Sequence, residues 1–213
     1  MNWKRKLSDD FSLYLILDAE VTNYEHLLMI ALEAVNHGVD IIQLRDKSGS
    51  AKKIIKFYQE FSKEVNKQMP FIINDRVDIC DSIDAAGVHL GQDDLSLKYA
   101  RKILGNEKII GISCQTFEQA KKAQDEGADY IGFGSVFKTL TKPDRDSMDL
   151  LLLEKVATTI KIPVFAIGGI TVENIEILKE KGVRCFAVCR AICLAENIAQ
   201  VTQAFKRNIL SKN

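Results

Sequence analysis

Eight short apolar runs alternate with amphipathic segments along this chain, at a spacing of roughly 25 residues. This alternation constrains the fold more than any other feature of the sequence. The segments between the runs place apolar residues at helical spacing. Short runs that are apolar throughout are typical of parallel strands buried on both faces, so the pattern predicts an α/β fold of strand–helix units. The runs cover residues 13–17, 39–44, 71–73, 86–90, 108–113, 129–134, 163–167 and 185–189.

Two α/β architectures fit this pattern, an open doubly wound sheet and a closed barrel. An open sheet would gather its ligand-binding groups at one switch point. Here, polar or glycine residues follow most of the runs, and a closed barrel would bring all of them to one rim. We therefore predict a single (β/α)8 TIM barrel over residues 1–213, with 1–12 as an N-terminal extension. The residues at these ends are Arg45, Asn74, Gln92, Ser113, Thr139 and Gly169.

The charge balance limits the classes of partner that we expect. The chain has 29 basic and 29 acidic residues, so its formal net charge is zero. General attraction to nucleic acid or to an anionic membrane needs a basic excess, so we expect neither. Residues 1–12 lack the apolar core of a signal peptide, and no apolar run reaches the roughly 18 residues of a membrane span. We expect a cytoplasmic protein that acts on small molecules. The oligomeric state stays open, a homo-oligomer included.

The five cysteines are expected to be free thiols, because their number is odd and no secretion signal precedes them. Cys185, Cys189 and Cys193 are spaced by four, which suits no paired zinc motif, and no histidine lies near them. Cys185 and Cys189 share one face of a predicted strand, where cysteine behaves as a small hydrophobic residue. We expect no metal cluster there.

Carboxylates follow two neighbouring predicted strands. Asn74 and Asp75 come directly after the run at 71–73, and Asp94 follows the run at 86–90. If these ends lie side by side, the two carboxylates form a site for a hard cation such as Mg²⁺. The alternative for both segments is capping of the helix that follows, since these residue types are favoured there.

Groups suited to phosphate occur in two further loops. Arg45 and Lys47 place two cations in one short loop, where charge can serve a ligand or only solubility. The connection 137–149 is the only long one, and it carries Thr139, Thr141 and Lys142. Such a loop is more often functional than idle, and its closure over a substrate would exclude water.

Gly168-Gly169 and His89 admit two interpretations each. The two glycines precede a predicted helix at 172–181, so their backbone N–H groups can approach a phosphate at the positive end of the helix dipole. They can equally serve only to turn the chain. His89 lies between Val88 and Leu90 in a predicted strand. We expect it to be a hydrogen-bonded interior histidine rather than a catalytic base.

Taken together and in order, these segments resemble the thiamine phosphate synthase family from about residue 13 to residue 192. The resemblance implies a (β/α)8 barrel transferase that joins hydroxymethylpyrimidine diphosphate to thiazole phosphate and releases pyrophosphate. It also implies Mg²⁺ on the diphosphate and a dissociative displacement. The matching motifs are Gln43-Leu44-Arg45-Asp46-Lys47, Asn74-Asp75-Arg76, Gly87-Val88-His89-Leu90-Gly91-Gln92-Asp93-Asp94, Gly111-Ile112-Ser113, Thr139-Leu140-Thr141-Lys142 and Ile167-Gly168-Gly169-Ile170.

The resemblance also implies roles for residues at matching positions. Asp75 and Asp94 would hold Mg²⁺. Arg45, Lys47, Ser113 and Lys142 would act in catalysis by stabilising the departing pyrophosphate. The pyrimidine diphosphate would be bound by Gln43, Arg45, Lys47, Asn74, Ser113 and Lys142, and the thiazole phosphate by Thr139, Thr141, Gly169, Cys189 and Arg190.

The end of the eighth predicted strand departs from the family pattern. The family places small residues there, often a serine before Ala-Ile, and this chain has Cys189 and Arg190 before Ala191-Ile192. Arg190 would either bind the thiazole phosphate or obstruct its place. The alternative functions are a thiazole tautomerase, which relies on a histidine where this chain has Gln115, and a non-catalytic binder of phosphate ligands on the same barrel.

Overall fold

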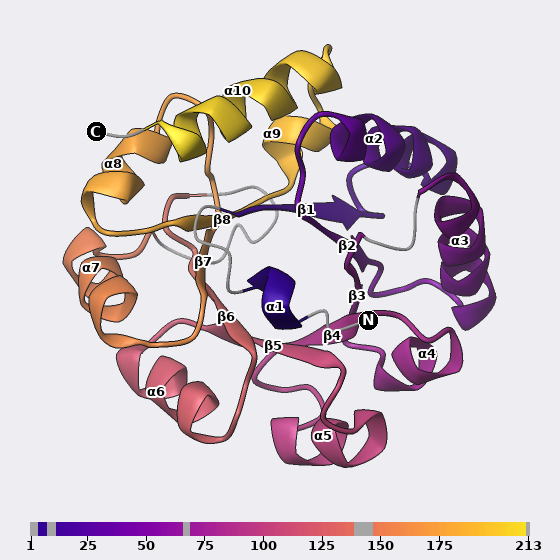
Figure 1. Ribbon diagram of the computed structural model, residues 1–213, viewed down its shortest axis with the longest axis horizontal. Coiled ribbons are helices and arrows are strands. Elements are labelled where there is room, and N and C mark those ends of the chain that lie inside the picture. The colour runs from indigo at the N-terminus through magenta and orange to yellow at the C-terminus, as the bar shows by residue number, and fades with distance from the viewer. Residues whose placement is uncertain (1–3, 8–11, 66–68, 139–146, 212–213) are drawn as a thin grey trace.

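Eight parallel strands form a closed barrel in the computed structural model, which describes residues 4–7, 12–65, 69–138 and 147–211. Each strand pairs with the next in the chain, and β8 pairs with β1 (Figure 1). The predicted TIM barrel is therefore confirmed. The strands are β1 Leu13–Asp18, β2 Ile41–Arg45, β3 Phe71–Asn74, β4 Gly87–Leu90, β5 Ile109–Cys114, β6 Tyr130–Phe133, β7 Val164–Ile167 and β8 Cys185–Val188.

Helices surround the ring of strands, as Figure 1 shows. Most of them occupy the amphipathic segments between the predicted strands, although α8 begins three residues later than the helix predicted at 172–181. Two short helices, α1 and α9, were not predicted, because four residues are too few for a helical period to show. The helices are α1 Lys4–Leu7, α2 Tyr24–Asn36, α3 Ala51–Glu64, α4 Val77–Ser82, α5 Leu97–Leu104, α6 Phe117–Asp125, α7 Leu150–Thr159, α8 Ile175–Glu180, α9 Arg190–Cys193 and α10 Ile198–Leu210.

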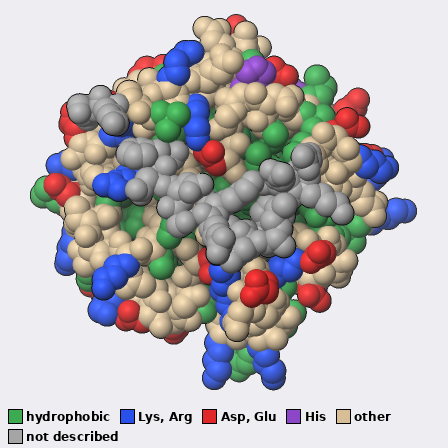
Figure 2. Space-filling model, in the orientation of Figure 1, with side chains coloured by type: hydrophobic (Ala, Val, Ile, Leu, Met, Phe, Trp, Pro, Cys, Tyr) green, Lys and Arg blue, Asp and Glu red, His purple; other side chains and the backbone are tan. Residues whose placement is uncertain are grey.

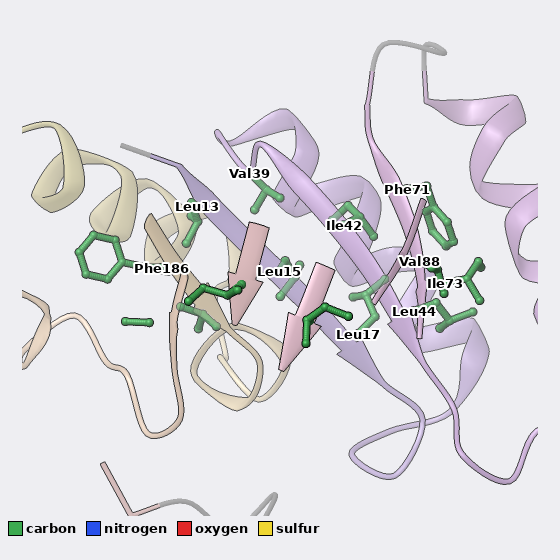
Figure 3. Close-up of a cluster of buried hydrophobic side chains, with 14 of the residues drawn as sticks. Leu13, Leu15, Leu17, Val39, Ile42, Leu44, Phe71, Ile73, Val88 and Phe186 are labelled. Carbon is green, nitrogen blue, oxygen red and sulfur yellow. The ribbon is translucent and has the colours of Figure 1, made fainter. Parts of the chain in front are cut away.

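Alternation along β1 separates two buried layers. Leu13, Leu15 and Leu17 are fully buried in the layer between strands and helices, together with side chains such as Leu27 of α2. Figure 3 shows these leucines beside the equivalent residues of neighbouring strands. Burial of each such side chain contributes about 1.5–3 kcal/mol. The layer fixes the strand positions, so the intervening residues of β1 must face the barrel interior.

The amino-terminal end of the barrel interior is filled by apolar side chains. Tyr14, Tyr130 and Phe165 pack there, and Leu7 of α1 joins them with 3% of its surface exposed. The Lys4 Nζ lies 2.8 Å from Asp129 Oδ1, which ties α1 to the start of β6. In Figure 1, α1 lies within the outline of the ring.

Toward the carboxyl ends of the strands, the interior changes character around the ring. We call the ends of β1–β5 the polar half of the rim, because their interior residues are polar or charged. We call the ends of β6–β8 the small-residue half, because glycine and alanine predominate there. The polar half is defined by Asp18, Gln43, Arg45, Asn74, His89 and Ser113, and the small-residue half by Gly132, Gly134, Gly168, Gly169 and Ala187.

The outer surface carries charges of both signs. On the face drawn in Figure 2, Lys and Arg side chains are interspersed with Asp and Glu around the periphery. Neither sign forms a continuous surface there, in keeping with the zero formal net charge. Within the described ranges, no helix has both the length and the apolar character needed to cross a bilayer.

Candidate active site

A cavity of about 440 Å³ lies at the carboxyl ends of the strands, and both halves of the rim line it. Many of the predicted site residues therefore line one cavity, although they are far apart in the sequence. This is the position at which TIM-barrel active sites lie. The nominated residues that line the cavity are Gln43, Arg45, Asn74, Ser113, Gly169, Cys189 and Arg190.

Arg45 is held in the cavity wall by an acidic residue that the sequence did not single out. Its Nη1 donates to Asp18 Oδ2 at 2.7 Å and lies 3.3 Å from Glu20 Oε2. The Asp18 side chain has no exposed surface. Burial alone would lower the pKa of the Arg45 guanidinium, but Asp18 and Glu20 outweigh it and raise this pKa. Arg45 is thus a fixed, fully charged cation.

Asn74 presents an unused hydrogen-bond donor. The residue is 8% exposed, lines the cavity, and its Nδ2 has no hydrogen-bond partner among the residues that the structure describes. A buried donor without a partner costs about 1–3 kcal/mol. An acceptor on a ligand would remove that cost, so Asn74 is suited to bind one.

Asp75 and Asp94 lie against each other, as expected for the ends of neighbouring strands. Asp75 has a left-handed backbone with φ 61°, and Asp94 Oδ2 accepts from the Gly91 N–H at 2.7 Å. Neither carboxylate caps a helix, since Arg76 stands at the start of α4 and Ser96 at the start of α5. The capping alternative is therefore wrong for both.

The electrostatics of this pair suit a cation. Burial raises the pKa of Asp75, the adjacent Asp94 raises it further, and Lys47 opposes both. The Lys47 Nζ lies 3.5 Å from Asp75 Oδ2, and its side chain is half exposed. Among the described residues, no group of three or more His, Cys, Asp or Glu side chains could hold a metal. An ion bound by these two carboxylates would need further ligands besides the His, Cys, Asp and Glu side chains of the described residues.

Ser113 is held by His89, and both line the cavity. His89 Nε2 lies 2.9 Å from Ser113 Oγ, and Nδ1 lies 2.9 Å from the Tyr130 hydroxyl. His89 is thus an interior histidine with both ring nitrogens hydrogen-bonded, as expected. Sequence reasoning missed Tyr130 and Tyr14, whose hydroxyl accepts from Gln43 Nε2 at 2.7 Å. Alternation along the strands is the signal that places both tyrosines inside, where a phenol needs a partner.

In the small-residue half, Gly168 and Gly169 form a tight wall. Gly169 has φ 63°, and a Cβ there would lie 2.7 Å from the carbonyl oxygen of Lys138. The Phe137 N–H donates to the Gly168 oxygen at 3.1 Å, which holds the loop after β6 against β7. Helix α8 begins only at Ile175, six residues after Gly169. The prediction that the positive end of a helix dipole assists Gly169 is therefore wrong.

Cys189 and Arg190 follow β8 at the cavity wall. A hydrogen bond with Cys193 and burial both raise the pKa of the Cys189 thiol well above its usual range, so it stays a neutral thiol. The five cysteines are free, as predicted. The Arg190 side chain makes no ion pair within the described part of the chain, although it lines the cavity. Thr139, Thr141 and Lys142 lie outside the described residues.

The family model for thiamine monophosphate synthase matches residues 13–192 of this chain. The chain belongs to the thiamine monophosphate synthase family. The match covers all eight strands and every described residue of the site, so the family predicted from the sequence motifs is confirmed.

Members of the thiamine monophosphate synthase family are similar to the chain over nearly its whole length. Thiamine-phosphate synthase 2 of Streptococcus pneumoniae is 40% identical over 207 residues, covering 93% of this chain and 97% of the relative. Thiamine-phosphate synthase of Persephonella marina is 42% identical, covering 92% and 95%. The structure of thiamine phosphate pyrophosphorylase from Pyrococcus furiosus superposes with a TM-score of 0.83 at 33% identity, covering 98% of both chains. The protein is therefore an enzyme, a transferase of this family.

Proposed function

We propose that the protein joins hydroxymethylpyrimidine diphosphate to thiazole phosphate, with Mg²⁺ present, to give thiamine phosphate and pyrophosphate. The relatives named thiamine-phosphate synthase support the reaction class. The observation that carries the assignment of the diphosphate is the adjacent Asp75 and Asp94, with Lys47 beside them and the unpartnered amide of Asn74 next along the chain. Carboxylates, a cation and a free amide donor together suit a metal-bound diphosphate.

Asp75 and Asp94 fit Mg²⁺ by their chemistry. Mg²⁺ in nucleotide and diphosphate sites is bound through one or two carboxylates, with phosphate oxygens and water completing its shell. When bound, the ion would neutralise charge that develops on the departing pyrophosphate. Lys47, which now faces Asp75, would be available to the same diphosphate.

The cations and donors of the polar half would stabilise the leaving group. The bond between the pyrimidine methylene carbon and the diphosphate oxygen breaks, and its electron pair leaves with pyrophosphate. The thiazole nitrogen then gives its lone pair to the same carbon, so this displacement needs no proton transfer by the protein. Arg45, Lys47 and Ser113, with Lys142, would bind the developing charge.

No nucleophile or strong base is needed in this reaction, and the cavity matches that requirement. The Cys189 pKa is raised, and His89 has hydrogen-bond partners at both ring nitrogens. The main task of the protein is then to hold two ligands in contact and to exclude water.

The small-residue half would hold the thiazole phosphate. The backbone at Gly169 and Cys189 lines the wall, and we assign Thr139 and Thr141 to the same ligand. We propose that Arg190 binds the phosphate rather than obstructing it, because it lines the cavity without a carboxylate partner in the described chain. A guanidinium can donate two parallel hydrogen bonds to one phosphate.

The test is to mix the purified protein with both substrates and Mg²⁺ and to measure thiamine phosphate and pyrophosphate in equal amounts. A chelator in excess over Mg²⁺ should stop the reaction, and renewed Mg²⁺ should restore it. Folded protein that binds either ligand but forms no product would refute the synthase proposal in favour of a non-catalytic binder. Isomerisation of the thiazole alone would favour the tautomerase.

A further inference from the structure

A chain of five hydrogen-bonded side chains crosses the barrel interior, and both of its ends lie in the cavity. Gln43 Nε2 donates to the Tyr14 hydroxyl at 2.7 Å, and the Tyr14 and Tyr130 hydroxyls are 2.9 Å apart. The Tyr130 hydroxyl lies 2.9 Å from His89 Nδ1, and His89 Nε2 lies 2.9 Å from Ser113 Oγ. The five residues come from β2, β1, β6, β4 and β5 in that order.

The barrel is shaped to hold this chain. A Cβ at Gly111 would overlap the Tyr130 ring, and a Cβ at Gly132 would lie 3.2 Å from His89 Cε1. Both glycines lie in strands, where they make space for a ring from another strand. Tyr14 and Tyr130 are each 1% exposed, and burial raises the pKa of both phenols, so each keeps its proton and can donate one hydrogen bond.

The direction of donation follows from the Gln43 end. The Gln43 amide donates a hydrogen bond, so the Tyr14 oxygen accepts it. The Tyr14 hydroxyl in turn donates a hydrogen bond to the Tyr130 oxygen. Tyr130 then donates to His89 Nδ1, which must carry no proton. His89 carries its proton on Nε2 and donates it to Ser113. The Ser113 hydroxyl proton is left to point to the cavity.

The opposite direction is disfavoured. If His89 donated from Nδ1, the Tyr130 proton would go to Tyr14, whose oxygen would then accept from Gln43 as well. The Tyr14 proton would have no acceptor among the described residues. A buried unpaired donor lowers the population of such an arrangement by roughly tenfold or more. A doubly protonated His89 meets the same obstacle.

We propose that Tyr130 and His89 are positioning residues: Tyr130 fixes His89 as its Nε2–H tautomer, and His89 thereby presents the Ser113 hydroxyl as a hydrogen-bond donor to an anionic ligand. The identity of that ligand as a diphosphate rests on the proposed function. The direction matters because a donor stabilises a phosphate oxygen, whereas an oxygen lone pair at the same place would repel it.

The first test reads the tautomer directly. Protein labelled with ¹⁵N at histidine has three imidazoles, and the His26→Gln and His37→Gln variants assign the signals of His89. Long-range ¹H–¹⁵N spectra distinguish a protonated from an unprotonated ring nitrogen. We expect the Nε2–H form in the wild-type protein. An Nδ1–H form or an imidazolium would overturn the proposal.

The second test removes the hydroxyl that donates to the imidazole. Tyr130→Phe keeps the ring but leaves His89 Nδ1 without this donor, and it should give a mixture of both His89 tautomers. Tyr14→Phe should keep the Nε2–H form, because the Tyr130 hydroxyl then has only His89 Nδ1 as its acceptor among these five residues, and Tyr99→Phe on the exposed face of α5 should change nothing. A His89 tautomer that is unchanged in the folded Tyr130→Phe protein would overturn the proposal.

Kinetics separate this inference from the proposed function. In the Tyr130→Phe variant, kcat/KM for the pyrimidine diphosphate should fall about tenfold, while KM for the thiazole phosphate stays unchanged. An equal loss for both substrates would indicate a merely structural effect and count against the proposal. A wild-type protein that makes no thiamine phosphate would refute the proposed function. The tautomer spectra would still decide whether the hydrogen bonds from Gln43 to Ser113 run in this direction.

Discussion

The two halves of the rim solve the problem of binding an anion in different ways. The polar half uses charged side chains, with Arg45 paired with the buried Asp18 and with the carboxylates of Asp75 and Asp94 next to each other. The small-residue half uses closely packed backbone, with Gly169 against the 135–138 segment and with the cations Lys138 and Arg190 in the cavity wall. The polar half holds two carboxylates next to each other, which costs stability, whereas the small-residue half is held together by contacts between its own backbone segments.

The largest effect is expected from breaking the buried ion pair of the polar half. Arg45→Met leaves the carboxylate of Asp18 buried without its partner, which should cost about 3–5 kcal/mol in the free energy of unfolding. Urea unfolding followed by circular dichroism measures this. The double variant with Asp18→Asn should recover most of the loss. An equal loss in the single and double variants would mean that packing of Arg45, rather than its charge, is what matters.

The next effect tests the carboxylate pair as a cation site. Asp94→Asn keeps an oxygen for the Gly91 N–H but removes a charge, and turnover with Mg²⁺ should fall by about 10²–10³-fold. Product formation over a Mg²⁺ titration measures it. Asp93→Asn, at the neighbouring exposed position, is the matched control and should retain activity. Unchanged Mg²⁺ dependence in Asp94→Asn would remove this residue from the site.

A smaller effect addresses the small-residue half. Arg190→Ser should raise KM for the thiazole phosphate by roughly tenfold, since a charge-assisted hydrogen bond is lost, and leave KM for the pyrimidine diphosphate unchanged. Steady-state kinetics with each substrate varied in turn measure this. Arg207→Ser on the exposed side of α10 serves as control. A lower KM in Arg190→Ser would show that the arginine obstructs the phosphate.

The smallest effect has the opposite sign. Asp75→Asn should increase the stability of the metal-free protein, by less than about 1 kcal/mol, because it relieves the repulsion from Asp94 and the cost of burying a charge. Asparagine also tolerates the left-handed backbone at this position. Thermal unfolding in a chelator measures the change. Asp78→Asn, which removes the exposed partner of Arg76, should not raise the melting temperature, and a decrease in Asp75→Asn would contradict the comparison.

The same contrast explains how much the sequence could predict. The period of apolar runs predicted the barrel and placed its strands to within about two residues. Asn74, Asp75 and Asp94 could be predicted because charged or amide residues at the end of a buried strand, or shortly after it, are recognisable in the sequence alone. Their contact then follows from the pairing of β3 with β4.

Other parts of the site have no local signature. Tyr14 and Tyr130 are 116 residues apart, so their hydrogen bond depends on closure of the barrel and not on any neighbouring residue. In the sequence, Asp18 is only the last residue of a predicted strand, and its ion pair with Arg45 becomes visible only in the structure. Gly169 is similarly ambiguous, because its close contact with Lys138 depends on how two loops pack.

Helix α1 has a consequence for how ligands reach the cavity. Leu7 fills the amino-terminal end of the barrel interior, and the cavity in the described structure opens at the other end. Under the proposed function, two substrates and two products would share that opening. Release of a product and entry of the next substrate would then compete for the same route.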